Sequence, residues 1–531
     1  MALVFAVYVP TLNDYFHGDD YLAFIDLTTK EPWPQIRDVF AFADSNVYWR
    51  PLGHVYYFAI YSLAGLDAYY FHLASVGLLM LTLVLLYKFS VGFGLNRHIA
   101  LAAVLIFGIL PNHVVSVAWV TNAPRLLAVL FALWSLVLVQ QCLRKDRRRY
   151  EVLAFLAMAL AVLSDEVAVS LTPLPLLYAL LSQRSLLEHK LANSLRLIAF
   201  GALGLAVTIL QFTVGKTEGE IAPAVISLTQ FGIGPHIPRE FWALASKLVL
   251  PTEDGVTLTD IAPAQWVAGA VAGVLALMAL VAGTKRAWFL IAWIALALAP
   301  FTLWETPIAP ARYVYMAAVP FAVLVAWSVA SLMGAIWRWR PFVIVQRAGL
   351  STALYLLVAL IVGAGGTLAA QETIARNETY ARQAEPYRAL AENLPRALPS
   401  VPPHSRLVIY YGVWDGSFVW QDAVVQTIFK DRTLTTVNVD AELSEELSVI
   451  PLPRDIVVYY TERGFILPSL SRPTQQPSTM EPPKRQPGDT GVPFAQPGVT
   501  IPTDTPLENT NIPVVPPEAP PTPEPSPTPP N

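Results

Sequence analysis

Two adjacent carboxylates, Asp19 and Asp20, follow the first apolar segment in the stretch NDYFHGDDYLAFI. A carboxylate next to a reacting hydroxyl can act as a general base. An arginine suits the complementary task, because its planar guanidinium binds phosphate through two parallel hydrogen bonds. Arg50 and Arg312 lie in the short polar stretches YWRPL and PARYVY, beside apolar segments. Such a set could displace a phosphate from a sugar carbon with an acceptor hydroxyl.

The acidic pair has two interpretations. An aspartate at this position can simply cap the first turn of a helix that lies at the membrane interface. We favour a catalytic role for one of the two, with Asp20 as the base and Asp19 as the residue that orients it. The residue types alone do not decide which aspartate removes the proton.

Further polar residues occur in or beside apolar runs, namely His113 in PNH, Glu166 in SDE and Tyr313 next to Arg312. Polar groups in membrane segments are costly and tend to mark function. We predict that Arg50, His113, Glu166, Arg312 and Tyr313 bind the donor phosphate or the substrate. The structural alternatives stay open: His113 could be a hydrogen-bonded helix end, Glu166 a helix cap, and Arg312 and Tyr313 interfacial anchors.

The composition places these residues in an integral membrane protein. The 531-residue chain is 54% hydrophobic and only 14% charged, whereas soluble domains are about 25% charged. A net charge of −4 gives no indication of a nucleic-acid partner. One cysteine excludes an intrachain disulfide and a cysteine-rich zinc site. No cofactor is predicted, and a divalent metal is not indicated, although the sequence does not exclude one.

About eleven apolar runs are candidates for membrane-spanning helices, which need roughly 20 residues each. They cover 1–12, 69–87, 98–118, 125–142, 150–163, 167–183, 195–214, 262–283, 287–304, 313–333 and 350–370. With a cytoplasmic N-terminus, most Lys and Arg residues fall in short inner loops, as the positive-inside rule requires. The first external loop is then 13–68 and the second large one 215–261. This topology brings every candidate residue to the external face of the cell membrane.

The composition changes after residue 370. The runs RLVIYYG and DIVVYYT are typical of strands, and WQDAVVQTIFKDR between them is typical of a helix. We predict a mainly α, polytopic transmembrane bundle at 1–370 and a small extracytoplasmic α/β domain at 371–467. Residues 468–531 are rich in Pro and Thr, which predicts a disordered external tail.

Five stretches carry a resemblance to a known family. In order along residues 10–330 they are NDYFHGDDYLAFI, YWRPLGHVYYFAIYSLAGLDAYYFHLASVGLL, LPNHVVSVAWV, LSDEVAVSLTPLPLLY and ARYVYMAAVPF. The set resembles the GT-C superfamily of membrane glycosyltransferases, in particular the protein O-mannosyltransferases and the TMTC-type enzymes, without the tetratricopeptide repeats of the latter. Four positions depart from the family pattern: Val115 replaces an acidic residue, Asp165 replaces a lysine, and Ala123 and Arg125 stand where an arginine and an aspartate are usual.

The resemblance implies a GT-C-like bundle that transfers a hexose, mannose-like, from a polyprenyl-phosphate donor to a hydroxyl of a protein or glycan acceptor. It also implies that Asp19 or Asp20 is the base and that catalysis needs no metal. The alternative function is a transporter or flippase of lipid-linked or cell-envelope precursors. Transporters tend to carry ionisable residues near the bilayer midplane and paired halves, whereas here the charges lie at span ends.

Overall fold

The structure is a computed structural model that describes residues 1–41, 49–145, 147–182, 190–213, 232–249, 284–303, 311–338, 348–411, 421–440, 455–461 and 464–466. The chain divides into two units, 1–486 and 487–531, and all described residues lie in the first. The described part is mainly helical with one small sheet, which confirms the predicted fold class. The predicted tail lies outside the described residues.

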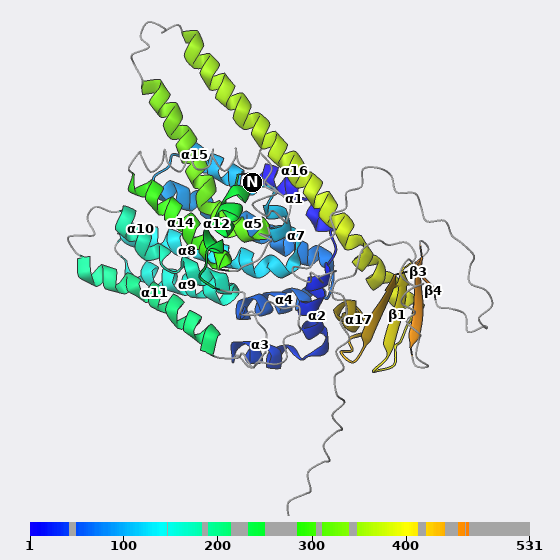
Figure 1. Cartoon of the computed structure of the whole chain (residues 1–531). Helices are drawn as coiled ribbons and strands as arrows, with labels where there is room; N and C mark the ends of the chain where they lie inside the picture. Colours follow the sequence, from blue (N-terminus) through cyan, green and yellow to red (C-terminus); the bar gives the residue numbers. More distant parts are fainter. Residues whose placement is uncertain are drawn as a thin grey trace, which may run out of the picture. The chain divides into compact units, whose positions relative to one another are not determined.

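The helices of the N-terminal half run from the first residues to the candidate span at 195–214 (Figure 1). They are α1 (Ala2–Tyr8), η1 (Pro10–Asn13), α2 (Gly18–Thr29), α3 (Pro32–Phe40), α4 (Pro51–Ala64), α5 (Ala68–Gly92), α6 (Arg97–Gly108), α7 (His113–Ala118), η2 (Val120–Asn122), α8 (Ala123–Lys145), α9 (Arg148–Ser164), η3 (Glu166–Leu171), α10 (Leu174–Ser182) and α11 (Lys190–Thr213). The later helices are α12 (His236–Lys247), α14 (Lys285–Thr302), η6 (Ala311–Val314), α15 (Tyr315–Arg338), α16 (Ala348–Ala397) and α17 (Gln421–Phe429).

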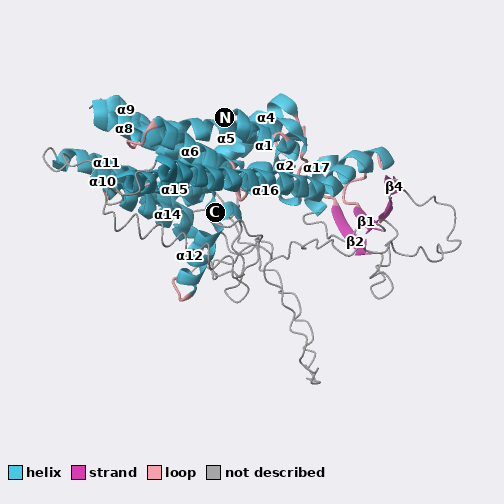
Figure 2. Cartoon of the chain, turned by 90° about the horizontal axis from the view of Figure 1, so that it is seen from above, coloured by secondary structure: helices cyan, strands magenta, loops and turns pink. Residues whose placement is uncertain are grey.

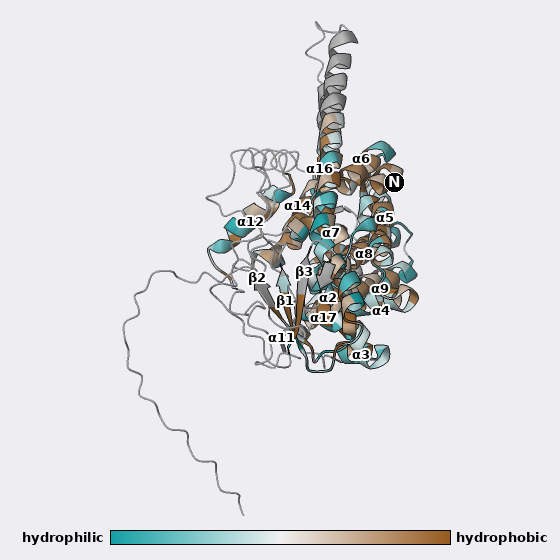
Figure 3. Ribbon diagram, turned by 90° about the vertical axis from the view of Figure 1, so that its right-hand side faces the viewer, coloured by the Kyte–Doolittle hydropathy of each residue, from teal (hydrophilic) through white to brown (hydrophobic). Residues whose placement is uncertain are grey.

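Four segments of the described residues are long and apolar enough to cross a membrane, namely Ala68–Gly92, Val120–Lys145, Lys285–Thr302 and Ala311–Ser331. Shorter apolar helices cover Ala2–Asn13, Arg97–Gly108, Glu166–Leu181 and Ile198–Leu210. Apolar residues dominate the ribbons of α5, α6 and α8, whereas α12 mixes polar and apolar residues (Figure 3). The predicted span at 262–283 lies outside the described residues, and the total of about eleven stays a prediction.

The predicted spans 98–118 and 167–183 are not continuous α-helices. The run 98–118 breaks where α6 ends at Gly108, and α7 begins only at His113. Pro111 lies in this gap and cannot donate a helical hydrogen bond. The run 167–183 likewise starts as the 3-10 helix η3 and continues as α10 after Pro173. The first break places non-helical backbone directly before His113, which apolar composition alone did not predict.

The core of the helical part forms where small side chains let helices approach closely. Ala154, Ala157 and Ala161 of α9 are buried against α8, as small residues often are between membrane helices. Ser135 of α8 donates a hydrogen bond to the carbonyl of Ala154 at 2.7 Å. This packing holds the start of α8 and the end of α9, which both carry site residues.

The sheet contains β1 (Arg406–Tyr411), β2 (Thr435–Asp440), β3 (Ile456–Thr461) and β4 (Gly464–Ile466) in the order β2-β1-β3-β4. β1 pairs in parallel with β2 and β3, and β4 pairs antiparallel to β3. The labelled strands lie together near α17 (Figure 2). The strands at RLVIYYG and DIVVYYT and the helix between them are confirmed, whereas β2 (TTVNVD) was not predicted.

Helix α2 of the predicted first external loop packs on this α/β part. Phe24 of α2, Ile409 of β1 and Val424 of α17 are fully buried in one apolar cluster. The hydroxyl of Thr427 also donates to the carbonyl of Tyr21 at 3.4 Å. The sheet and α17 therefore hold the helix that carries the acidic pair.

Helix α16 continues without a break across residue 370, where the sequence predicts a domain boundary. It contacts α1, η1 and α7 (Figure 1). The hydroxyl of Thr11 donates to Asn377 Oδ1 at 2.9 Å, and the hydroxyl of Thr373 donates to the carbonyl of Ile109 at 3.0 Å. α16 thus connects the predicted last span to the segment before the acidic pair.

Candidate active site

Asp20 is fully buried in the first turn of α2, and both of its carboxylate oxygens accept backbone hydrogen bonds. Oδ2 accepts from the amide of His17 at 2.9 Å, and Oδ1 accepts from the amide of Thr121 at 2.8 Å. Burial raises the pKa of Asp20 to about 7 against the effect of these hydrogen bonds, and nearby Asp19 adds to the rise. Asp20 therefore caps α2 and joins it to η2, which directly precedes α8.

Asp19 precedes Asp20 in the same turn and is half-buried. Its carboxylate lies close enough to raise the pKa of Asp20. A negative charge in the first turn of a helix is stabilised by the helix dipole. The structure thus separates the pair into one buried aspartate bound to backbone amides and one aspartate with partial access to solvent.

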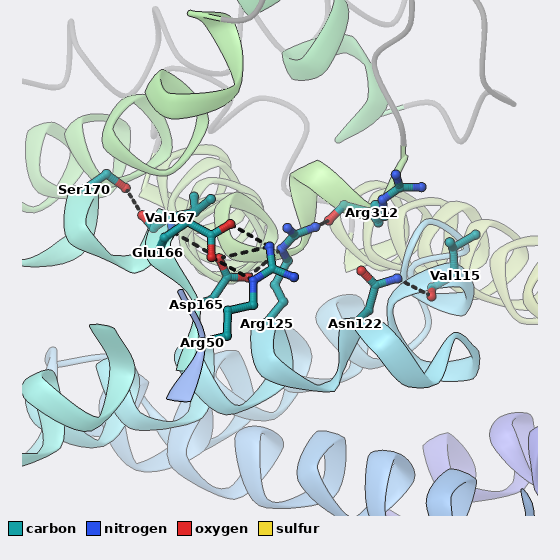
Figure 4. Close-up of polar contacts among 9 residues, drawn as sticks. All are labelled: Arg50, Val115, Asn122, Arg125, Asp165, Glu166, Val167, Ser170 and Arg312. Atoms are coloured by element: carbon teal, nitrogen blue, oxygen red, sulfur yellow. Dashed lines mark hydrogen bonds and ion pairs between the residues drawn. The ribbon is translucent and has the colours of Figure 1, made fainter. Parts of the chain in front are cut away.

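Four charged side chains form an ion-pair network, namely Arg50, Arg125, Asp165 and Glu166 (Figure 4). Arg50, directly before α4, binds Glu166 with two hydrogen bonds of 2.7 and 2.6 Å. Arg125 binds Asp165 Oδ2 through Nε at 3.2 Å, and Asp165 also lies 4.0 Å from Arg50. Two guanidiniums face two carboxylates, so the charges balance within the network.

Asp165 is the fully buried member of the ion-pair network. Burial alone would raise its pKa, but the guanidiniums of Arg50 and Arg125 and the amide of Val167 hold the pKa below its usual value. Opposite charges at this distance favour the ionised form. The network therefore holds α4, α8 and the α9–η3 turn together as a paired, ionised unit.

Arg312 lies in η6 beside this network. Its carbonyl accepts a hydrogen bond from Arg125 Nη1 at 3.5 Å, while its guanidinium points away from the ion-pair network (Figure 4). The guanidinium lies 4.7 Å from the ring centroid of Trp119. Among the described residues no carboxylate forms an ion pair with Arg312. Its charge is therefore not neutralised within the described part of the chain.

Tyr380 of α16 marks the point where the acidic pair and Arg312 come together. Its hydroxyl is buried, and burial raises its pKa well above the usual value. The carboxylates of Asp20, Asp14 and Asp19 raise this pKa further, and the guanidinium of Arg312 lowers it. The His17 ring lies 3.8 Å from the Tyr380 ring, and the His17 amide binds Asp20. Arg312 lies over Trp119, which packs against the apolar cluster that contains Tyr380. These contacts bring the helix turn with the acidic pair and Arg312 to the same part of α16.

The other predicted residues occupy different surroundings. His113 is fully buried, with its ring 4.4 Å from Phe107 and 4.8 Å from Tyr315 between centroids. Tyr313 stacks on Phe301 at 4.3 Å, and Arg125 lies over both rings. Arg50 and Glu166 pair with each other. Binding roles for His113, Tyr313, Arg50 and Glu166 stay predictions.

Sequence reasoning gave no site role to Arg125, Asp165, Asp14 or Tyr380. A signal was present for two of them. An arginine at the start of an apolar span, such as Arg125, is costly unless a carboxylate neutralises it. Asp165 and Glu166 are the two acidic residues between the apolar runs 150–163 and 167–183. Tyr380 gave no signal, because its role depends on α16 returning to η1 and α7. Among the described residues no group of three or more His, Cys, Asp or Glu side chains is placed to hold a metal ion.

Residues 51–210 match the family described as dolichyl-phosphate-mannose-protein mannosyltransferase. This segment holds α4 to α11, with Arg50 directly before it and Arg125, Asp165 and Glu166 inside it. The match, over less than half of the chain, confirms the resemblance to mannosyltransferase-like membrane glycosyltransferases that the motifs predicted. No curated protein matches the chain.

Two solved structures are similar to the chain as a whole. ArnT from Cupriavidus metallidurans, bound to undecaprenyl phosphate, is 14% identical with a TM-score of 0.44, over 87% of this chain and 92% of that one. The oligosaccharyltransferase AglB from Archaeoglobus fulgidus, in complex with an inhibitory peptide and a dolichol-phosphate, is 12% identical with a TM-score of 0.46, over 81% and 63%. Likenesses of this size do not locate a site in this chain.

Proposed function

We propose that the protein transfers a mannose-like hexose from a polyprenyl-phosphate donor to a hydroxyl group of a protein or glycan on the external face of the membrane. The observation that carries this proposal is that Asp20, through His17, and Arg312, through Trp119, meet the same part of α16 at Tyr380. The match of residues 51–210 to mannosyltransferases supports the same reaction class. ArnT and AglB were solved with polyprenyl-type phosphates, which agrees with a lipid-linked donor.

Arg312 is proposed to bind the donor phosphate. Its guanidinium has no carboxylate partner among the described residues, whereas Arg50 and Arg125 are both paired. The hydrogen bond from Arg125 to the Arg312 carbonyl fixes the backbone that presents this cation. Positive charge at this point would stabilise the lipid phosphate as it leaves.

Asp19 is proposed as the general base, which reverses the assignment favoured from the sequence. Both oxygens of Asp20 accept backbone amides, so its role is to position α2 against η2. Asp19 takes the proton of the acceptor hydroxyl, whose oxygen attacks the anomeric carbon. The bond from this carbon to the phosphate oxygen breaks, and the electron pair leaves with the lipid phosphate.

The test is transfer of labelled mannose from polyprenyl-phosphate mannose by the full-length protein in lipid nanodiscs. Asp19→Asn should lower kcat by about 100-fold or more, the usual contribution of a positioned base. Asp38→Asn is the matched control, because Asp38 is an exposed carboxylate in the same predicted loop that pairs with its neighbour Arg37. Full activity of Asp19→Asn together with loss in Asp20→Asn would assign the base to Asp20.

Arg312→Gln should lower kcat/KM for the lipid donor by about 10- to 100-fold, because a charge-assisted bond to phosphate is lost. The control is Arg382→Gln, an exposed arginine of α16. Transport of the lipid across the bilayer without hexose transfer would support the flippase alternative and contradict the proposal. An unchanged donor KM and kcat in Arg312→Gln would remove Arg312 from the site.

A further inference from the structure

A group of buried polar atoms beside the acidic pair has no hydrogen-bond partner among the described residues. It comprises Asp14 Oδ1 and Oδ2, His17 Nε2, Trp119 Nε1 and Tyr380 Oη. We call these four residues the Tyr380 cluster. Buried polar atoms in folded proteins are nearly always paired, so each unpaired one needs an explanation. The Tyr380 hydroxyl and four such atoms beside it indicate a place that a polar ligand completes.

The four residues of the Tyr380 cluster are brought together by contacts to α16. The His17 ring lies 3.8 Å from the Tyr380 ring between centroids. Trp119 packs against the small apolar cluster that contains Tyr380. Asp14 acts electrostatically on the Tyr380 hydroxyl. The cluster is therefore built from the segment after η1, the end of α7 and α16.

The position of Asp14 is fixed on both sides. On one side, Thr11 donates to Asn377 Oδ1 at 2.9 Å, one turn of α16 before Tyr380. On the other side, Arg388 of α16 donates to the carbonyl of Asn13 at 2.5 Å. These two ties hold the segment 11–14 against α16, so the buried Asp14 carboxyl is placed by the fold.

We propose that the Tyr380 cluster binds the hydroxyl groups of the hexose ring carried by the lipid donor, and so determines which sugar the enzyme accepts. This inference rests on the proposed function. The set suits a neutral polyhydroxyl ligand, because the indole N–H donates a hydrogen bond, whereas a protonated carboxyl, a phenol and an imidazole can each donate and accept. A buried site built to bind hydroxyl groups strongly rejects a sugar that lacks one of them.

The position of Trp119 favours the donor sugar over the acceptor. Trp119 has an unpartnered Nε1, and its ring also carries the Arg312 guanidinium at 4.7 Å. A phosphate held by Arg312 would therefore place the attached sugar beside Trp119. Burial also raises the pKa of Asp14 to about 8, against the effect of Arg388, so near pH 7 its carboxyl is mostly protonated and can donate a hydrogen bond.

The experiment compares equilibrium binding of two lipids, polyprenyl phosphate and polyprenyl-phosphate mannose, to the full-length protein in nanodiscs without acceptor. Asp14→Asn should weaken binding of the mannosyl lipid about tenfold, and Tyr380→Phe about threefold, because each loses hydrogen bonds to sugar hydroxyls. Neither variant should change the affinity for polyprenyl phosphate, which also shows that both remain folded. Arg312→Gln should weaken both lipids.

Tyr8→Phe is the matched control, because Tyr8 carries another buried hydroxyl without a partner among the described residues. It should bind both lipids like the wild type. Wild-type protein that binds neither lipid would overturn the proposed function itself. Unchanged binding of the mannosyl lipid by Asp14→Asn and Tyr380→Phe would overturn only the sugar subsite. In the transfer assay, a rise of the acceptor KM alone in Asp14→Asn and Tyr380→Phe would assign the cluster to the acceptor. That result would also overturn the sugar subsite.

Discussion

The ion-pair network and the Tyr380 cluster are neighbouring polar regions that differ in how their polar groups are satisfied. In the network, Arg50, Arg125, Asp165 and Glu166 all have charged partners inside the chain. In the cluster, Asp14 and Tyr380 are buried without hydrogen-bond partners among the described residues. Polar groups that are paired within the chain hold the backbone in place, whereas buried polar groups without partners can still form hydrogen bonds to a ligand. By this difference, the network residues position the helices and the cluster residues are proposed to bind the substrate.

The largest expected effect is on the ion-pair network. Arg125→Met removes the buried partner of Asp165 and should lower the free energy of unfolding by about 3 kcal/mol, since it leaves a buried charge with less compensation. Thermal unfolding in detergent measures this loss. The double variant Arg125→Met/Asp165→Leu should recover part of it, because no buried charge then remains. Equal stability of the single variant and wild type would show that the network does not hold the fold.

A smaller loss is expected at the more solvated end of the network. Arg50→Gln breaks the two hydrogen bonds to Glu166 and removes the guanidinium 4.0 Å from Asp165, which keeps its hydrogen bond from Arg125. Both side chains of the Arg50–Glu166 pair keep about a fifth of their surface exposed. Water can then solvate Glu166, so stability should fall by about 1 kcal/mol. The same unfolding assay, with Arg37→Gln of the exposed Arg37–Asp38 pair as control, measures the difference. A larger loss of stability in Arg50→Gln than in Arg125→Met would show that Arg50 contributes more to stability than Arg125, contrary to this prediction.

The Tyr380 cluster should respond to pH in the opposite sense from a paired carboxylate. Burial raises the folded-state pKa of Asp14 to about 8, from a usual value of 3.8. The folded state therefore holds a proton that the unfolded state has lost, and the contribution of Asp14 to stability declines as pH rises through this window. Asp14→Asn, which keeps a neutral side chain, should raise the midpoint of thermal unfolding at pH 8.5 on the order of 2 °C.

The gain from Asp14→Asn should disappear at pH 4, where wild-type Asp14 is protonated in the folded state. The exposed Asp38→Asn variant serves as control and should shift the midpoint at neither pH. The opposite result would be a midpoint of thermal unfolding that rises between pH 4 and pH 8.5 in the wild type but not in Asp14→Asn. It would show that the Asp14 carboxylate is ionised and paired in the folded protein, and therefore not available to bind a ligand.

The smallest expected effect separates stability from binding. Tyr380→Phe removes a buried hydroxyl that has no partner among the described residues, so stability should stay equal or rise by about 0.5 kcal/mol. The same variant should weaken binding of the mannosyl lipid. Functional groups commonly lower stability in this way. A clear loss of stability would show that the Tyr380 hydroxyl forms a stabilising hydrogen bond in the folded protein. The Tyr380 cluster and the ion-pair network would then not differ in this respect.

The sequence predicted the membrane class, the family resemblance and most of the strands and helices, because long apolar runs and alternating patterns are local signals. It also singled out Asp19, Asp20 and Arg312, and the structure brings Asp20 and Arg312 to Tyr380 through His17 and Trp119. It did not separate the two aspartates. That difference depends on the amide of Thr121, about a hundred residues away, which only the folded chain brings to Asp20.

By itself, then, the sequence determined that this is a polytopic membrane protein with a GT-C-like motif order, since hydrophobicity and motif spacing are properties of the linear chain. Only the tertiary structure decided which charges neutralise each other and which polar groups stay unsatisfied. Arg50 and Arg312 are the same residue type in similar polar stretches of the sequence. In the fold, Arg50 forms hydrogen bonds to Glu166, whereas Arg312 lies over the ring of Trp119. Pairing depends on distances across the fold, and in a buried environment those distances set the energy of every charge.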